Sequence, residues 1–104
     1  MGDRLQALQR MAKDRPGDAR LQFGLAVEFL NRGETRKGAD ALRAYLALTE
    51  DEGNGWGRLG SALADLGERE EAREAYTRGI EIATARGHSG LAAELTEARE
   101  SLGP

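Results

Sequence analysis

Apolar side chains recur along the whole chain at intervals of three and four residues, the spacing that places them on one face of an α-helix. Six such stripes follow one another: Leu5, Leu8 and Met11; Leu21, Leu25 and Phe29; Ala39, Leu42, Tyr45 and Leu46; Trp56, Leu59, Leu63 and Leu66; Ala72, Ala75, Tyr76, Ile80 and Ala83; and Leu91, Leu95, Ala98 and Leu102. The chain has 17 alanines and only 8 β-branched residues, too few for a sheet. The pattern therefore predicts an all-α protein of about six helices.

Helix boundaries are marked by turn residues and by candidate caps between the stripes. Arg15-Pro16-Gly17 ends the first helix, and Asp18 is placed to cap the second. Gly33 and Gly67 end the second and fourth helices, where we expect a positive φ angle. Thr35 is the candidate cap of the third helix, and the acidic, glycine-rich stretch 50–57 is expected to form a loop before the fourth. The fifth helix is expected over residues 69–86, ending at Gly87. Short turns predict antiparallel neighbours.

An internal period of 34 residues relates the two halves of the chain. Gly33-Glu34 aligns with Gly67-Glu68. The same offset aligns apolar or small positions in pairs: Leu25 with Leu59, Phe29 with Leu63, Gly38 with Ala72, Leu42 with Tyr76, and Leu46 with Ile80. A fixed period of this length is typical of a repeat architecture, in which each helical hairpin buries its apolar face by stacking on the next.

The second copy, with Trp56-x-x-Leu59-Gly60-x-x-Leu63, then Gly67 and Ala72-x-x-x-Tyr76, resembles the tetratricopeptide repeat family. The resemblance implies a right-handed stack of antiparallel hairpins in one domain, residues 1–104. It consists of a half-repeat at 3–16, full repeats at 19–52 and 53–86, and a capping helix at 88–102. The first copy departs from the pattern, with Gln22 in place of Trp56, and neither copy has the closing proline, since Glu50 and Thr84 stand there.

The resemblance further implies a non-enzymatic protein-interaction module that binds a peptide or helix of a partner in a concave groove. The groove residues that it implies are Arg20, Phe23, Val27, Asn54, Arg58, Ser61, Asp65, Leu91, Leu95 and Arg99. Gly24 and Gly57 also fall on this face, where they either admit a ligand backbone or mark loose packing. The family's carboxylate clamp of Lys, Asn and Arg is not expected, because Phe23, Val27 and Asp65 occupy its asparagine and lysine positions.

Four interpretations stay open at this level. One part of the implied groove is an apolar strip flanked by arginines, which suits an amphipathic helix or an acidic extended peptide. The strip consists of Phe23, Val27, Leu91 and Leu95, and the arginines are Arg20, Arg58 and Arg99. Alternatively, Phe23 and Val27 pack under the first helix or the cap. The outer faces of Leu5-Leu8 or Leu91-Leu102 could instead form a homodimer. A small-ligand site or an enzyme around Arg58 and Asp65 is the least favoured alternative.

Composition and charge narrow the candidate chemistry. No cysteine and the single His88 argue against a disulfide framework and a metal site, so no metal or cofactor is expected. Acidic and basic residues are interleaved, with a net charge of −3, which disfavours nucleic acid as a partner. No long apolar run or signal peptide is recognised, which predicts a cytoplasmic protein without membrane contact. Arginine makes up 13 of the 15 basic residues, which we take as a sign of a bacterial source.

Overall fold

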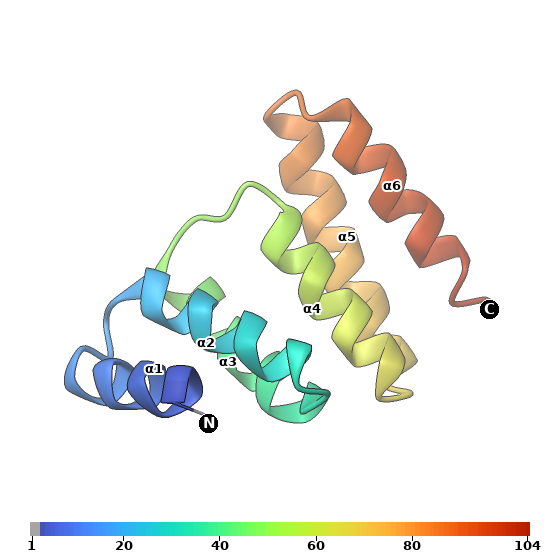
Figure 1. Cartoon of the computed structure of the whole chain (residues 1–104). Helices are drawn as coiled ribbons and strands as arrows, with labels where there is room; N and C mark the ends of the chain where they lie inside the picture. The colour runs from blue at the N-terminus through green and yellow to red at the C-terminus, as the bar shows by residue number, and fades with distance from the viewer. Residues whose placement is uncertain (1–2) are drawn as a thin grey trace. The chain divides into compact units, whose positions relative to one another are not determined.

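The computed structural model describes residues 3–104 and confirms the all-α helical-repeat fold, with six helices and no strand among these residues (Figure 1). The helices are α1 (Asp3–Asp14), α2 (Ala19–Asn31), α3 (Thr35–Leu48), α4 (Asn54–Asp65), α5 (Arg69–Ala85) and α6 (Ser89–Glu100). They form two compact units, one ending at Thr49 and the other running from Glu50 to Pro104. The division lies close to the predicted boundary between the two full repeats.

The first unit contains α1, α2 and α3, with α2 packed against both of its neighbours. Its most deeply buried side chains are Ala26, Ala39 and Leu42, each 0% exposed. Gly38 allows α3 to lie close to α2, because a Cβ atom there would come within 2.6 Å of Leu30. A small residue at this position of α3 is therefore a packing requirement.

The second unit contains α4, α5 and α6, and α5 packs against both other helices. Leu59 and Leu63 of α4 are each 1% exposed, and Ala72 of α5 is fully buried. The ring of Tyr76 lies over Gly60, whose missing Cβ would stand 2.7 Å from two ring atoms. As in the first unit, a small residue on one helix accepts a large side chain from its hairpin partner.

Three helices end in the same hydrogen-bonded turn. After α2, the N–H of Gly33 donates to Leu30 O and the N–H of Glu34 donates to Phe29 O, at 3.1 and 2.9 Å. The same pair of bonds closes α4 at Gly67 and α5 at Gly87. Gly33 and Gly67 have φ angles of 77° and 78°, as expected from the sequence. This is the Schellman motif, whose left-handed residue favours glycine because it has no Cβ.

Helix starts agree with the sequence at one candidate cap and differ at the other. Asp18 Oδ1 accepts hydrogen bonds from the N–H groups of Arg20 and Leu21, at 3.0 and 3.3 Å, which confirms its capping role. The prediction for Thr35 is wrong, because Thr35 is already the first residue of α3 and Glu34 occupies the N-cap position without a side-chain bond. The Schellman turn leaves one residue between Gly33 and the helix, so α3 begins immediately.

Candidate functional site

The predicted groove residues of the first unit lie on α2 and at its start. Arg20 is exposed, while Phe23 and Val27 are half-buried. Phe23 packs against Tyr45 of α3, with ring centroids 5.0 Å apart and planes inclined by 59°. Gly24, on the same helix, faces α1, since a Cβ there would lie 3.7 Å from Leu8. Phe23 is therefore held by its own hairpin partner and keeps part of its ring in solvent.

The predicted residues on α4 form a polar row on the surface of the second unit. Asn54, Arg58, Ser61 and Asp65 are all exposed. Their spacing of three and four residues places them on one face of the helix. The apolar face of α4, with Leu59 and Leu63, is covered within the unit. The row is thus a continuous polar strip of four side chains.

Ser61 and Asp65 also lie close enough to Tyr76 to influence its hydroxyl. Burial raises the pKa of Tyr76 above its ordinary value of 10.0, and the negative charge of Asp65 adds to the effect. A hydrogen bond with Ser61 acts in the opposite direction. These two predicted groove residues are therefore coupled to Tyr76, which packs on α4 from α5.

The predicted residues on α6 serve mainly to fix this helix to its unit. Leu95 is 6% exposed, and its Cδ2 atom lies 2.6 Å from where a Cβ on Gly57 would stand. Leu91 packs on Gly53 in the same way, with its Cδ2 atom 3.2 Å from where a Cβ on Gly53 would stand. Arg99 donates a hydrogen bond to Thr77 Oγ1 at 3.0 Å. The space over Gly57 is thus filled by Leu95, and the glycine serves helix packing.

Sequence reasoning missed the capping role of Asp51, which holds the start of α4. Its carboxylate is 6% exposed, and its Oδ2 accepts hydrogen bonds from the N–H groups of Gly53 and Gly55, at 2.8 and 2.7 Å. Amide donors at a helix N-terminus favour a negative charge. An acidic residue two positions before a glycine N-cap is the local signal for it, but using that signal requires knowing how the backbone turns at Gly53.

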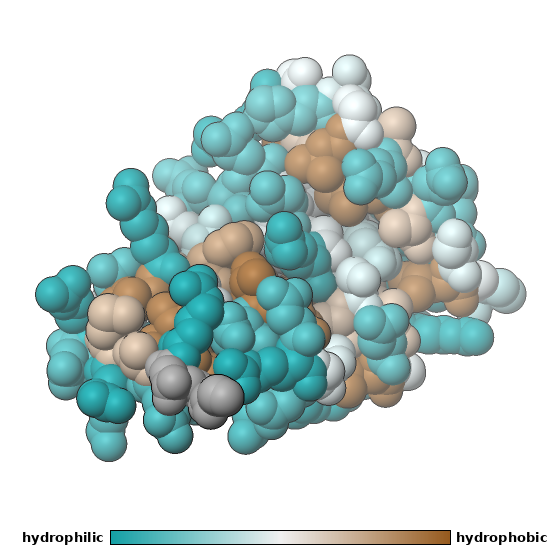
Figure 2. All heavy atoms as spheres, in the orientation of Figure 1, coloured by the Kyte–Doolittle hydropathy of each residue, from teal (hydrophilic) through white to brown (hydrophobic). Residues whose placement is uncertain are grey.

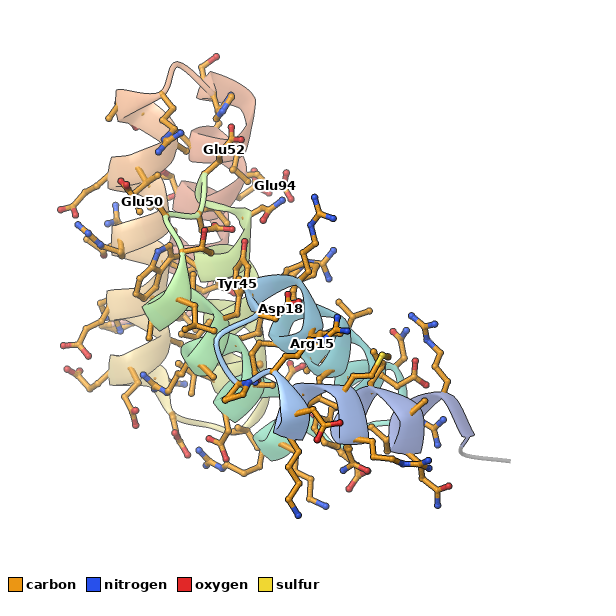
Figure 3. The ribbon with its side chains drawn as sticks, turned by 90° about the vertical axis from the view of Figure 1, so that its left-hand side faces the viewer. Arg15, Asp18, Tyr45, Glu50, Glu52 and Glu94 are labelled. Carbon is orange, nitrogen blue, oxygen red and sulfur yellow. The ribbon has the colours of Figure 1, made fainter. Side chains whose placement is uncertain are left out.

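A second contact joins the same segment to α6. Glu52 Oε1 lies 2.7 Å from His88 Nε2, and both side chains are exposed. Glu52 projects from the segment before α4, close to the labelled Glu50 (Figure 3). This contact therefore links His88, the N-cap residue of α6, to the loop before α4 on the surface of the second unit.

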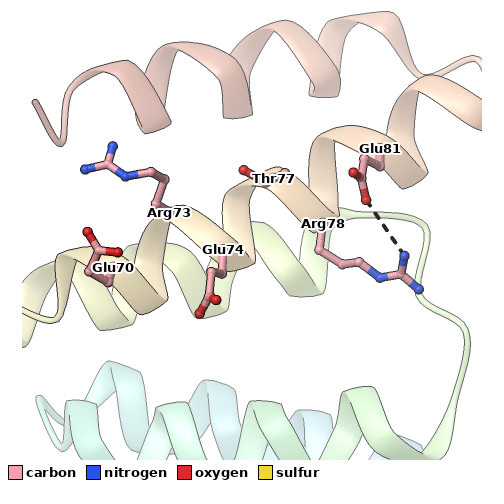
Figure 4. Close-up of a pocket in the computed structure, with 6 residues that line it drawn as sticks. All are labelled: Glu70, Arg73, Glu74, Thr77, Arg78 and Glu81. Atoms are coloured by element: carbon pink, nitrogen blue, oxygen red, sulfur yellow. Dashed lines mark ion pairs between the residues drawn. The ribbon is translucent and has the colours of Figure 1, made fainter. Parts of the chain in front are cut away.

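A shallow surface depression follows α5. Its lining comes from one helix face: Glu70, Arg73, Glu74, Thr77, Arg78 and Glu81 (Figure 4). Arg78 and Glu81 form an ion pair at 3.8 Å, and Arg73 donates two hydrogen bonds to Gly103 O, at 3.1 and 3.0 Å. Five of the six lining side chains are charged. Hydrophilic residues also cover much of the face of the molecule seen in Figure 2. The depression is an open, solvated surface.

Among residues 3–104, no three His, Cys, Asp or Glu side chains are grouped closely enough to hold a metal ion. Over the same range, no helix combines the length and apolar character needed to cross a membrane.

The fold and the repeat can be compared with known proteins. The chain is 27% identical over 92 residues to a TPR repeat-containing protein of Pseudomonas aeruginosa, covering 88% of each chain. It is 35% identical over 78 residues to a peroxisomal targeting signal receptor of Candida albicans, covering 75% of this chain and only 13% of that protein. No protein-family model matches the chain.

A solved structure with the same fold is that of PcrH in complex with the chaperone binding region of PopD, with a TM-score of 0.84 at 18% identity. The match covers 94% of this chain and 74% of PcrH. The architecture is therefore a helical-repeat fold in which hairpins follow one another at a fixed period. With the 34-residue repeat and the relatives above, it shows that the chain belongs to the tetratricopeptide repeat family.

Proposed function

We propose that this chain is a non-enzymatic protein-interaction module that binds a peptide or helix of a partner protein through the first helices of its two hairpins, α2 and α4. The observation that carries the proposal is the exposed polar row Asn54, Arg58, Ser61 and Asp65. These residues lie on the surface, although the opposite face of α4 is buried by its own unit. A binding surface on a rigid, packed helix is well placed for recognition.

The fold supports this proposal. PcrH was solved together with a segment of PopD, so a protein with this architecture holds part of another protein. For our chain, the corresponding proposal concerns only the kind of ligand, a segment of polypeptide. Helical-repeat folds use extended surfaces of this type for recognition.

The side chains favour a partner segment with both apolar and acidic residues. The half-buried Phe23 and Val27 offer apolar surface on α2, and Arg20 lies exposed on the same helix. Arg58 presents a second exposed guanidinium on α4. Guanidinium groups pair with carboxylates through two parallel hydrogen bonds, which gives direction as well as attraction.

Affinity capture from the native host with matched surface variants tests the proposal. Phe23→Glu and Arg58→Glu should each abolish capture of the partner, with an unchanged far-UV circular dichroism spectrum. Arg69→Glu, which makes the same charge change on the exposed start of α5, is the control and should retain capture. Capture that survives both Phe23→Glu and Arg58→Glu would refute the assignment to α2 and α4.

A further inference from the structure

Among residues 3–104, α1 and α6 lie outside the two repeat hairpins, α2–α3 and α4–α5. In the 34-residue register, α1 corresponds to α3 and α5, the second helices of hairpins, and α6 corresponds to α2 and α4, the first helices. Within its unit, α1 packs on α2, and α6 packs on α5 and α4. Within residues 3–104, neither helix has the hairpin neighbour that the corresponding helices of the two full repeats have.

The first unit shows which positions of a second helix face its partner. Gly38 of α3 lies against Leu30 and the carbonyl of Ala26 on α2, and Tyr45 lies against Phe23. A shift of 34 residues carries Gly38 to Arg4 and Tyr45 to Met11 on α1. The Arg4 side chain is 71% exposed and Met11 is 41% exposed. The open face of α1 thus combines a basic and an apolar side chain.

The equivalent face of α6 is acidic. Ala26 and Gly60 are buried against their partner helices, and the same register places Glu94 at this position on α6. The buried Phe29 and Leu63 correspond to Glu97. Both glutamates are exposed, and Figure 3 labels Glu94 on this helix. The two open faces therefore carry opposite charges at the positions where hairpin partners approach.

The charge of the two units follows the same division. The unit that ends at Thr49 has nine basic and six acidic residues, whereas the unit from Glu50 to Pro104 has six basic and twelve acidic residues. Opposite net charges attract the two surfaces before contact and disfavour pairing of like ends.

We propose that α1 of one copy packs against α6 of a second copy, in the way that α3 packs against α2 within the chain. In this arrangement Arg4 lies beside Glu94, as Gly38 lies beside Ala26 in the first hairpin. Met11 falls beside Leu91, as Tyr45 lies beside Phe23. The inference concerns the ends of the chain and does not depend on the proposed partner surface on α2 and α4.

The pairing is head to tail, so a pair of copies keeps one free α1 and one free α6. A contact of this kind generates open chains of copies rather than a closed dimer. Arginine and glutamate are larger than the glycine and alanine at the internal positions, so the helices at the junction stand further apart. Because Arg4 also pairs with Glu28 at 3.0 Å, the junction extends an existing ion pair. We therefore expect weak association that weakens further as salt screens the charges.

Sedimentation velocity over a range of protein and salt concentrations tests this proposal. The wild-type chain should show a weight-average mass that rises with concentration at low salt and falls towards the monomer at about 1 M salt, where the screening length is about 3 Å. A monomer at every concentration in low salt overturns the proposal.

Two charge-reversed variants identify the surfaces. Glu94→Arg with Glu97→Arg makes both end faces basic, and Arg4→Glu makes both acidic, so each variant alone should stay monomeric. An equimolar mixture should associate again, because every junction then joins opposite charges. Glu70→Arg with Glu74→Arg on α5 changes the charge equally and should associate like the wild type. Melting curves establish that each variant is folded. A mixture that remains monomeric refutes the assignment to α1 and α6.

Discussion

The effect of Gly60→Ala on stability depends on the ring of Tyr76, which lies over Gly60. In a helix, Gly→Ala normally stabilises by about 1 kcal/mol, because alanine has the higher helix propensity. At Gly60 the new methyl group would stand 2.7 Å from two ring atoms of Tyr76 and 3.0 Å from a third. The ring is 6% exposed, so it has little room to move. Overpacking costs about 1–3 kcal/mol, which cancels or exceeds the gain in helix propensity, so we expect a net loss of up to about 2 kcal/mol for Gly60→Ala.

The corresponding positions of the first hairpin, α2–α3, show how this clash can be avoided. The residues that correspond to Gly60 and Tyr76 are Ala26 and Leu42, and both are 0% exposed. Alanine therefore fits this crossing when its partner is leucine. In a Tyr76→Leu background, Gly60→Ala should no longer destabilise, and the difference between the two backgrounds measures the coupling of the pair.

Urea denaturation followed by tryptophan fluorescence gives the required free energies. Trp56, the single tryptophan, lies on α4 in the same unit as both residues, so it reports on that unit. Gly24→Ala is the matched control, because its methyl group would meet only Leu8 at an ordinary 3.7 Å. Followed by circular dichroism, the control should gain about 1 kcal/mol, or roughly 5 °C in Tm. An equal loss for Gly60→Ala with and without the Tyr76 ring would refute the packing argument.

Three further predictions follow from single side chains. Asp51→Ala should destabilise the second unit by about 1–2 kcal/mol, read from the Trp56 urea midpoint, because two buried amide donors lose their acceptor. Since burial raises the pKa of Tyr76, its contribution to stability is complete below pH 10.0 and is lost as pH rises through the folded-state value. Absorbance at about 295 nm should therefore show one tyrosine ionising late, and Tyr76→Phe should remove this transition. Arg32 and Arg4 lower the pKa of Glu28 below 4.5, so its contribution is present above that pH and is lost on acidification. Carboxyl NMR titration should find a midpoint below 4.5 that rises in Arg32→Ala, and an unchanged midpoint would contradict the ion pair at 2.9 Å.

The helices and their turns were predictable because they depend on local pattern. Apolar spacing and glycine placement located all six helices, and the Asp18 cap was correct because its bonds span only two and three residues. The caps at Thr35 and Asp51 could not be assigned in this way. The first is displaced by the geometry of the preceding turn, and the second requires knowledge of how the backbone folds at Gly53.

The candidate binding residues were less predictable than the fold. Periodicity indicates which side chains share a helix face, but it does not say which neighbouring helix covers that face. Leu95 shows the difference, since it shares the register of Ser61 on α4 and Val27 on α2, yet it is buried over Gly57. The exposed row on α4 stays a predicted binding surface, supported by its accessibility and tested by the variants proposed above.

The three identical turns after α2, α4 and α5 have a consequence for how such a chain can change in length. Each turn satisfies its last helical carbonyls with its own two N–H groups, at Gly33 and Glu34, at Gly67 and Glu68, and at Gly87 and His88. The backbone hydrogen bonds that close these turns join residues only three or five positions apart. If one 34-residue block were duplicated or lost in the gene, the new junction could therefore fall in a turn that closes its helix by local hydrogen bonds. The chain could therefore gain or lose whole repeats without needing a new loop.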